Sequence, residues 1–134
     1  MKHKIMNTVY IVLCVVLIGA LILLLAPKLL GWQSLVILSD SMNPTYEYGD
    51  IIWVRPCQVQ EVEIGDVISF RDRNGVSTTH RVVGVDENHR IITKGDANVD
   101  QDAYLVDEKH LYGEVVGKIP RIGKIAIALQ RFSR

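Results

Sequence analysis

The stretch Gly65-Asp66-Val67-Ile68-Ser69-Phe70-Arg71-Asp72-Arg73-Asn74-Gly75 decides the fold of this chain. Gly65-Asp66 is a turn signal, and the residues after it are mostly β-branched or aromatic, which favours a strand. Arg73-Asn74-Gly75 is typical of a tight hairpin turn. The residues from Val76 through Val85 form the next candidate strand. The sequence therefore predicts a β-hairpin here.

The same pattern occurs upstream, and strand signals continue downstream. Gly49-Asp50-Ile51-Ile52-Trp53-Val54 repeats the Gly-Asp turn and its β-branched run. Leu35-Val36-Ile37-Leu38 predicts a first strand. Arg90-Ile91-Ile92-Thr93 predicts a return strand after the polar turn Asp86-Glu87-Asn88-His89. No long amphipathic helical pattern interrupts these hairpins, so we expect a mostly β domain.

The N-terminal end carries a long uncharged segment. Between Lys4 and Lys28 no side chain is charged, and as a helix rising about 1.5 Å per residue this stretch can cross a hydrocarbon core of about 30 Å. A cleaved signal peptide is the alternative interpretation, because Lys2 and Lys4 precede the apolar region. The segment is too long for a signal-peptide core and lacks an Ala-x-Ala exit. We therefore favour a retained single transmembrane anchor.

The charges that flank the anchor predict its orientation. Lys2, Lys4 and the amino terminus make the N-terminal flank positive, which by the positive-inside rule leaves the N-terminus in the cytoplasm. Lys28 on the far flank opposes this slightly. Residues 1–28 are thus expected to form a cytoplasmic tail and plasma-membrane anchor, and residues 29–134 an extracytoplasmic domain.

Composition excludes some classes of function. The chain of 134 residues has room for one compact domain beside the anchor. Its 15 basic and 15 acidic residues give no net charge, so no global field attracts it to nucleic acid. Cys14 lies inside the anchor and Cys57 in the outer domain, which argues against a disulfide between them. Neither cysteine has metal-site spacing, and no metal or cofactor is expected.

Three polar residues suggest nucleophilic catalysis. Ser41 lies in Ser39-Asp40-Ser41-Met42-Asn43-Pro44 after the first predicted strand, His80 falls in mid-strand, and Asp102 ends the acidic run that includes Asp96. A serine hydroxyl needs a base within hydrogen-bond reach, and that base works best when a third group fixes its tautomer. We predict Ser41 as the nucleophile, His80 as the base and Asp102 as the orienting acid.

Other residues of these motifs are supporting or alternative candidates. The backbone N–H of Ser41 and the hydroxyl of Ser39 are candidate donors to the oxyanion. On residue type alone, a serine such as Ser39 more often hydrogen-bonds to the nearby backbone of a turn than to an oxyanion. Asp96 and Asp100 are so close in sequence to Asp102 that only one or two of the three can face the base.

At these segments the chain resembles the type I signal peptidases, specifically the endoplasmic-reticulum-like branch that also occurs in archaea and some Gram-positive bacteria. The resemblance covers roughly Val36 to Pro120. In that branch the serine of Ser-Met-x-Pro is the nucleophile and the histidine of a His-Arg-Val strand replaces the lysine of the bacterial branch. The resemblance implies these roles for Ser41 and His80, and a fold of β-hairpins and coiled sheets.

The resemblance extends to the acidic run and also shows one departure. The family's Lys-Gly-Asp-x-Asn segment matches Lys94-Gly95-Asp96-Ala97-Asn98, and its catalytic acid follows six positions after that Asp. This implies Asp102 as the third catalytic residue, Asp96 as a supporting acid and Asp100 as a rival. Asp40 stands where the family usually has Gly. If that position needs a backbone angle that Gly supplies, strain of about 1 to 3 kcal/mol would result.

The residues from Val115 to the C-terminus form a separate pattern. Their charges are all basic and alternate with apolar side chains: Lys118, Arg121, Lys124, Arg131 and Arg134. A basic amphipathic segment on the membrane face of the domain fits this periodicity. A closing strand with a frayed basic end fits it about equally well.

The sequence therefore predicts a membrane-anchored serine endopeptidase that removes signal peptides from exported precursors. The substrate would add as a β-strand beside the catalytic strand. Leu38, Met42 and Trp53 are candidates for lining the substrate groove or contacting lipid. Core packing is the better expectation for Leu38 and an equal one for Met42 and Trp53. Exported precursors, membrane lipid and the secretion translocon are the expected partners. The alternatives are a catalytically impaired or non-enzymatic anchored β domain, which Asp40 favours, and a self-cleaving protease with Lys94 as base.

Overall fold

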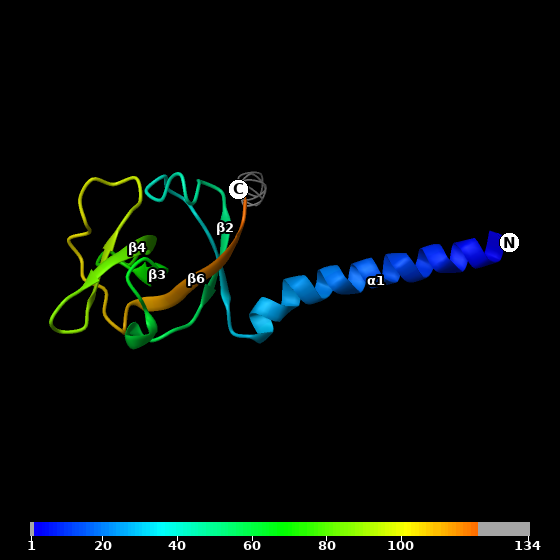
Figure 1. Ribbon diagram of the computed structural model, residues 1–134, viewed down its shortest axis with the longest axis horizontal. Helices are drawn as coiled ribbons and strands as arrows, with labels where there is room; N and C mark the ends of the chain where they lie inside the picture. Colours follow the sequence, from blue (N-terminus) through cyan, green and yellow to red (C-terminus); the bar gives the residue numbers. More distant parts are fainter. Residues whose placement is uncertain (1, 121–134) are drawn as a thin grey trace. The chain divides into compact units, whose positions relative to one another are not determined.

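The computed structural model describes residues 2–120 of the chain (Figure 1). Its elements are α1 (Lys2–Leu29), β1 (Gln33–Val36), β2 (Ile51–Arg55), a 3-10 helix (Val59–Glu61), β3 (Val67–Arg71), β4 (Ser77–Val85), β5 (Ile91–Lys94) and β6 (Leu111–Ile119). The chain divides between Trp32 and Gln33 into a helical unit and a β unit. Most of the predicted basic tail, residues 121–134, lies outside the described residues.

The helix α1 is the only one in residues 2–120 that is long and apolar enough to cross a membrane. The stretch Ile5–Leu29 contains 25 residues, which at about 1.5 Å each exceed a hydrocarbon core of about 30 Å. Large apolar side chains along it are exposed, as expected of an anchor in lipid. The helix ends two residues after Pro27, and Gly31 then takes a left-handed φ of 76°.

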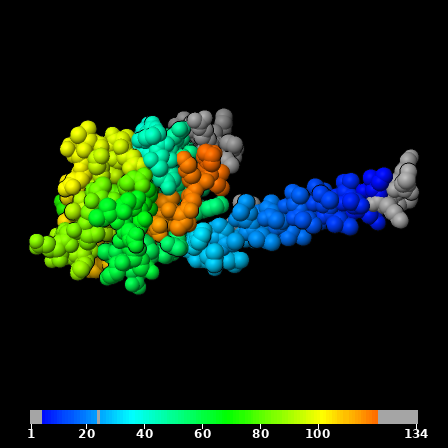
Figure 2. Space-filling model, in the orientation of Figure 1, coloured from blue at the N-terminus to red at the C-terminus, as the bar shows by residue number. Residues whose placement is uncertain are grey.

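Six strands form one antiparallel sheet in the order β1-β2-β6-β3-β4-β5. The last strand within residues 2–120, β6, lies in the middle of the sheet and pairs with both β2 and β3. Its far end is held by Lys118, whose Nζ donates to the carbonyl oxygen of Thr45 at 2.7 Å. Figure 2 shows the end of β6, in orange, at the surface beside the cyan-green residues near Thr45. The prediction of a mostly β domain after an N-terminal apolar helix is confirmed.

Strand β4 is paired over a different half of its length on each of its two edges. β3 pairs with Ser77–Arg81, whereas β5 pairs with β4 only from Arg81 onward. Within residues 2–120, no strand pairs with Ser77–His80 on the side away from β3. An unpaired strand edge is a template for a further extended chain.

The predicted strands are present, with shifted ends. β1 begins and ends two residues earlier than predicted, so Leu38 lies outside it. Val115–Ile119 belong to β6, which is the closing-strand alternative for that part of the tail. The two Gly-Asp motifs form equivalent turns, because the carboxylates of Asp50 and Asp66 each accept a hydrogen bond from the backbone N–H three residues earlier, at 3.0 and 2.8 Å. The repeated Gly-Asp pattern in the sequence therefore corresponds to a repeated turn in the structure.

Two apolar clusters, named here for their largest buried members, pack on the sheet. The Phe70 cluster contains Val59, Val62, Ile68, Phe70, Val82, Ile91 and Val106, and the Met42 cluster contains Ile37, Met42, Ile52, Val54, Val67 and Val115. Successive side chains of a strand point to opposite faces. In the β3–β4 pairing Phe70 lies opposite Thr78 and Ile68 opposite His80. Thr78 and His80 therefore share the face of the Phe70 cluster.

Gly113 allows β6 to approach the chain after β2 more closely than a side chain would permit. A Cβ here would lie 2.0 Å from the carbonyl oxygen of Arg55, and the φ of Gly113 is 151°. We expect Gly113→Ala to lower the free energy of unfolding by about 3 kcal/mol, because the backbone must shift. Denaturant unfolding of the detergent-solubilised chain measures this. Gly84→Ala, whose Cβ would meet Ile92 Cδ1 at 3.4 Å, is the control, and equal losses in the two variants would contradict the explanation.

Candidate active site

The turn that carries Ser41 follows β1 and is held down by the next residue. Met42 is 1% exposed and packs with Ile37 in the Met42 cluster. The backbone N–H of Tyr46 donates to the Met42 carbonyl oxygen at 2.9 Å, which closes the turn. Met42 is therefore packed in the core, and it also lines the groove described below. The neighbouring Ser41 remains partly exposed, so its hydroxyl can meet a substrate.

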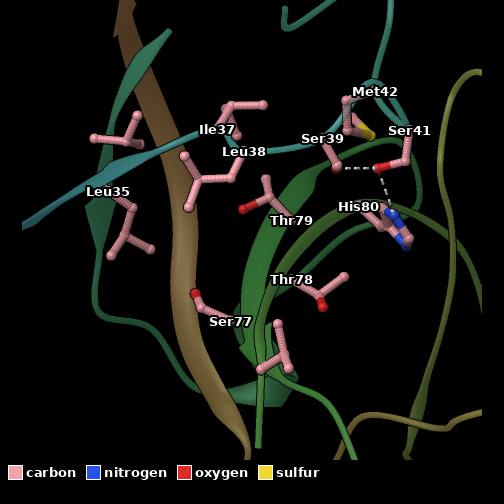
Figure 3. A pocket seen from close by; sticks show the side chains of 12 residues that line it. Leu35, Ile37, Leu38, Ser39, Ser41, Met42, Ser77, Thr78, Thr79 and His80 are labelled. Carbon is pink, nitrogen blue, oxygen red and sulfur yellow. Dashed lines mark hydrogen bonds between the residues drawn. The ribbon is translucent and has the colours of Figure 1, made fainter. Parts of the chain in front are cut away.

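His80 points from β4 toward Ser41. Its Nε2 lies 3.0 Å from Ser41 Oγ (Figure 3). The imidazole is 7% exposed, and its ring makes an edge contact with Phe70 at a centroid distance of 6.3 Å. A mid-strand position with this packing fixes the direction of the ring, as the sequence predicted.

Asp102 lies on the other side of the imidazole. Its Oδ2 is 2.5 Å from His80 Nδ1 and accepts a hydrogen bond from Thr93 Oγ1 at 2.7 Å. The backbone N–H of Asp102 also donates to the carbonyl oxygen of Thr93 at 2.8 Å, so β5 sets both the position and the orientation of the carboxylate. Burial acts to raise the pKa of Asp102, but the hydrogen bonds from His80 and Thr93 outweigh it and hold the pKa below its ordinary value.

The three side chains form a continuous chain of contacts from hydroxyl to carboxylate. A carboxylate at Nδ1 favours the tautomer that carries its proton there, which leaves Nε2 as the acceptor facing Ser41 Oγ. Such an imidazole can remove the hydroxyl proton when the oxygen attacks an electrophile. The arrangement is therefore chemically competent for acyl transfer.

Ser39 and Asp40 complete the Ser41 turn. The hydroxyls of Ser39 and Ser41 are 3.0 Å apart, so Ser39 lies beside the reacting atom. Asp40 is exposed. Among the non-glycine residues that the structure describes, only His89 has a positive φ. Asp40 thus does not need the left-handed backbone of glycine, and the strain considered from the sequence is absent.

Asp96 supports the site through a network that sequence analysis did not identify. Its Oδ1 and Oδ2 accept hydrogen bonds from Nε and Nη2 of Arg81 at 2.8 and 2.7 Å, and Oδ2 also accepts one from Thr45 Oγ1 at 2.6 Å. Arg81 Nη1 donates to the carbonyl oxygen of Gly65 at 2.8 Å. The network joins β4 to the residues after Ser41. Arg81 is the one Lys or Arg in β4 and directly follows His80, and this was the signal that could have revealed the network.

The loop after β5 passes directly beneath the backbone of Ser41. The N–H of Ala97 donates to the Ser41 carbonyl oxygen at 2.9 Å. A Cβ on Gly95 would lie 2.6 Å from that same oxygen and 2.7 Å from Asn98 Nδ2. Glycine is therefore required at this position by the close approach of two backbones.

Asp100 lies in the same loop but is exposed, and it is Asp102 that contacts the imidazole. The ring nitrogen that contacts Ser41 Oγ belongs to His80, and this contact favours His80 over Lys94, the alternative base. In the described part of the chain, no group of three or more His, Cys, Asp or Glu side chains could hold a metal ion.

Comparison with known proteins identifies the family. The profile of the family described as "Signal peptidase, peptidase S26" matches residues 6–115. The chain belongs to this signal peptidase family. The resemblance noted from the Ser41, His80 and Asp96 motifs is thereby confirmed at the level of the family.

Individual relatives come from both the endoplasmic reticulum type and bacteria. "Signal peptidase complex catalytic subunit SEC11" of Colletotrichum graminicola is 34% identical over 110 residues, which are 72% of this chain and 63% of the relative. The protein of the same description from Eremothecium gossypii is 33% identical, covering 80% of this chain and 78% of the relative. "Signal peptidase I W" of Bacillus subtilis is 31% identical, covering 86% of this chain and 63% of the relative. Several of these relatives are thus spanned for only about three fifths of their length.

The site formed by Ser41 and His80 opens into a groove of about 580 Å³, called here the Ser41 groove. It is bordered by Leu35–Ser39 on one side and Val76–His80 on the other, with Ser41 and His80 at one end (Figure 3). Leu38 is 65% exposed and lines this groove, so the expectation of core packing for Leu38 was wrong. β1 ends before it, and its side chain therefore turns away from the core.

The charge of Asp96 should contribute to stability with a defined pH dependence. The hydrogen bonds from Arg81, helped by Thr45 and opposed by burial, hold the pKa of Asp96 below its ordinary value. The charged form is thus favoured by folding, so its contribution is present above the unfolded carboxyl pKa of about 3.9 and is lost as the pH falls through the lower folded pKa. We expect Asp96→Asn to be less stable than wild type at neutral pH, with the difference shrinking below about pH 4.

Urea unfolding of the detergent-solubilised chain at several pH values measures this difference. Asp100→Asn is the matched control, because Asp100 is exposed in the same loop, and it should follow the wild type throughout. A constant difference between Asp96→Asn and wild type at every pH would show that the carboxylate charge is not what Arg81 and Thr45 stabilise.

Proposed function

We propose that this chain is a membrane-anchored serine endopeptidase that cleaves N-terminal signal peptides from exported preproteins. The observation that carries the proposal is the Ser41–His80–Asp102 arrangement, with Ser41 Oγ 3.0 Å from His80 Nε2 and His80 Nδ1 2.5 Å from Asp102 Oδ2, at the end of the Ser41 groove. Membership of the S26 family and the apolar helix α1 support the same activity.

The geometry supports a two-step acyl transfer. Ser41 Oγ attacks the scissile carbonyl carbon while His80 Nε2 takes the hydroxyl proton, and Asp102 stabilises the resulting imidazolium. His80 then gives that proton to the leaving amine as the peptide C–N bond breaks, leaving an ester on Ser41. A water molecule, deprotonated by His80, hydrolyses the ester and regenerates the hydroxyl.

The oxyanion of each step needs hydrogen-bond donors. We assign this role to the backbone N–H of Ser41 and to the hydroxyl of Ser39, which already lies 3.0 Å from Ser41 Oγ. The Ser39 hydroxyl can rotate from Ser41 toward the developing charge. Asp40 is exposed and can point its carboxylate into water, which reduces its repulsion of the oxyanion.

The substrate binds as an additional strand along Ser77–His80. This edge of β4 has no strand partner within residues 2–120, and it forms one border of the Ser41 groove. An extended peptide there can hydrogen-bond to the backbone and place alternate side chains in the groove. Leu35, Ile37 and Leu38 supply apolar contacts for small side chains on the opposite border.

The location follows from the anchor and from the substrate's own apolar segment. Residues 1–28 form the cytoplasmic tail and plasma-membrane anchor, and residues 29–134 the extracytoplasmic catalytic domain. Enzyme and precursor are then held at one bilayer surface, which raises their effective concentration. Lipid and the secretion translocon are the partners that this arrangement requires, since both lie where the precursor emerges.

Cleavage of a precursor with an Ala-x-Ala exit by the detergent-solubilised chain tests the proposal. We expect Ser41→Ala, His80→Ala and Asp102→Asn each to lower kcat by at least about a thousandfold, because the three groups act as one unit. Asp100→Asn should retain wild-type activity. Cleavage that survives Ser41→Ala would remove the nucleophile, and an inactive wild type would favour the catalytically impaired alternative.

Gly95→Ala tests whether the loop beneath Ser41 sets the catalytic geometry. The added Cβ must displace the Ser41 carbonyl oxygen or the Asn98 amide, and a shift of about 1 Å in a nucleophile can cost about a hundredfold in rate. We therefore expect kcat to fall about a hundredfold, with KM changing much less. Gly84→Ala is the control for the substitution itself, and a Gly95→Ala enzyme of normal kcat would contradict the role of this contact.

A further inference from the structure

A second cavity, called here the Tyr104 pocket, lies beside the imidazole of His80. It has a volume of about 310 Å³, and Phe70, Arg73, Thr78, His80, Asp102 and Tyr104 are among its lining residues. Phe70 belongs to the Phe70 cluster and Tyr104 packs against it. The Tyr104 pocket is therefore on the face of the sheet that carries this cluster.

The Ser41 groove lies on the other face at the same stretch of β4. Ile37 and Met42, which line the Ser41 groove, belong to the Met42 cluster. Thr78 and His80 line both cavities. The unpaired edge of β4 at Ser77–His80 therefore separates two cavities, one on each face of the sheet.

An extended peptide added to this edge must present its side chains to the two faces in turn. If the residues first and third before the scissile bond place their small side chains in the Ser41 groove, the residue between them faces the Tyr104 pocket. Resting on the proposed function, we propose that the Tyr104 pocket is a second substrate subsite. It holds the side chain of the precursor residue that is penultimate to the cleaved bond.

The lining of the Tyr104 pocket indicates which side chains it takes. Phe70 and Tyr104 offer aromatic surface to an aliphatic stem. The carboxylate of Asp72 is engaged by the turn, where its Oδ1 accepts the N–H groups of Asn74 and Val76 at 2.8 and 2.9 Å.

Arg73 supplies the charge at the rim. Asp102, the other acid at this pocket, is already bonded to His80 and Thr93. The guanidinium of Arg73 is exposed and lies 5.9 Å from the centroid of the Tyr104 ring. It can meet the tip of a long side chain, so Arg73 favours a long penultimate residue with an acidic or amide tip over a basic one, against the two carboxylates of Asp72 and Asp102 that also line the pocket.

Four precursor peptides that differ only in the central residue of an Ala-x-Ala exit test this assignment. With Glu, Gln, Ala or Lys at that position, the wild-type chain in detergent gives the reference ratio of kcat/KM for the Glu peptide to kcat/KM for the Lys peptide. In Arg73→Glu the Glu-to-Lys ratio should fall by about tenfold at low ionic strength and less at high salt, because two unit charges change at the rim. The Gln and Ala peptides, which carry no charge at that position, should change less than the Glu and Lys peptides.

The control is Arg90→Glu, which makes the same charge change in the exposed turn before β5, where Arg90 pairs with Asp86. It should leave the Glu-to-Lys ratio at the wild-type value. An unchanged ratio in Arg73→Glu, or an equal loss for all four peptides, would overturn the subsite. Failure of the wild type to cleave any of the peptides would instead overturn the proposed protease function, so the two failures are distinguishable.

Discussion

The contact on which the site depends most is the close approach of the loop after β5 to the backbone of Ser41. The hydrogen bond from Ala97 to the Ser41 carbonyl oxygen, and the absence of a side chain on Gly95, bring two segments together that are far apart in sequence. Farther along this loop, Asp102 lies beside Thr93 of β5. Its backbone N–H donates to the Thr93 carbonyl oxygen, and its carboxylate accepts a hydrogen bond from the Thr93 hydroxyl. The positions of nucleophile and acid are therefore set by one docking event, and His80 lies between them.

The ion pair between Arg81 and Asp96 holds the loop after β5 against β4. Side chains that are 33% and 16% exposed are largely removed from water, so their charges must compensate each other or destabilise the fold. Two hydrogen bonds between guanidinium and carboxylate, with Thr45 as a third partner, satisfy most of this requirement. Because Arg81 follows His80 on β4, the same pair that closes the loop also orients the strand that carries the base. The residue that binds the loop, Arg81, is thus next in sequence to the proposed base, His80.

The sequence predicted what depends on local pattern and missed what depends on long-range pairing. Turn residues and β-branched runs located the strands, and motif spacing located Ser41, His80 and Asp102. The insertion of β6 between β2 and β3 was not predicted, because irregular register at Trp53 and Ser69 leaves no simple pattern for its partners. Leu38 was misassigned because residue type favours burial, whereas the end of β1 exposes it.

An unpaired strand edge is normally a hazard, because it can pair with another chain and aggregate. In this protein the risk of aggregation is limited because the unpaired edge is short and because another segment lies across the groove from it. The unpaired part of β4 covers only Ser77–His80 before β5 begins to pair at Arg81, and the segment after β1 borders the groove on its far side. A single extended peptide can enter such a gap, whereas a preformed sheet cannot. The same restriction that protects the edge therefore selects for a substrate that arrives unfolded, as a segment emerging from a membrane does.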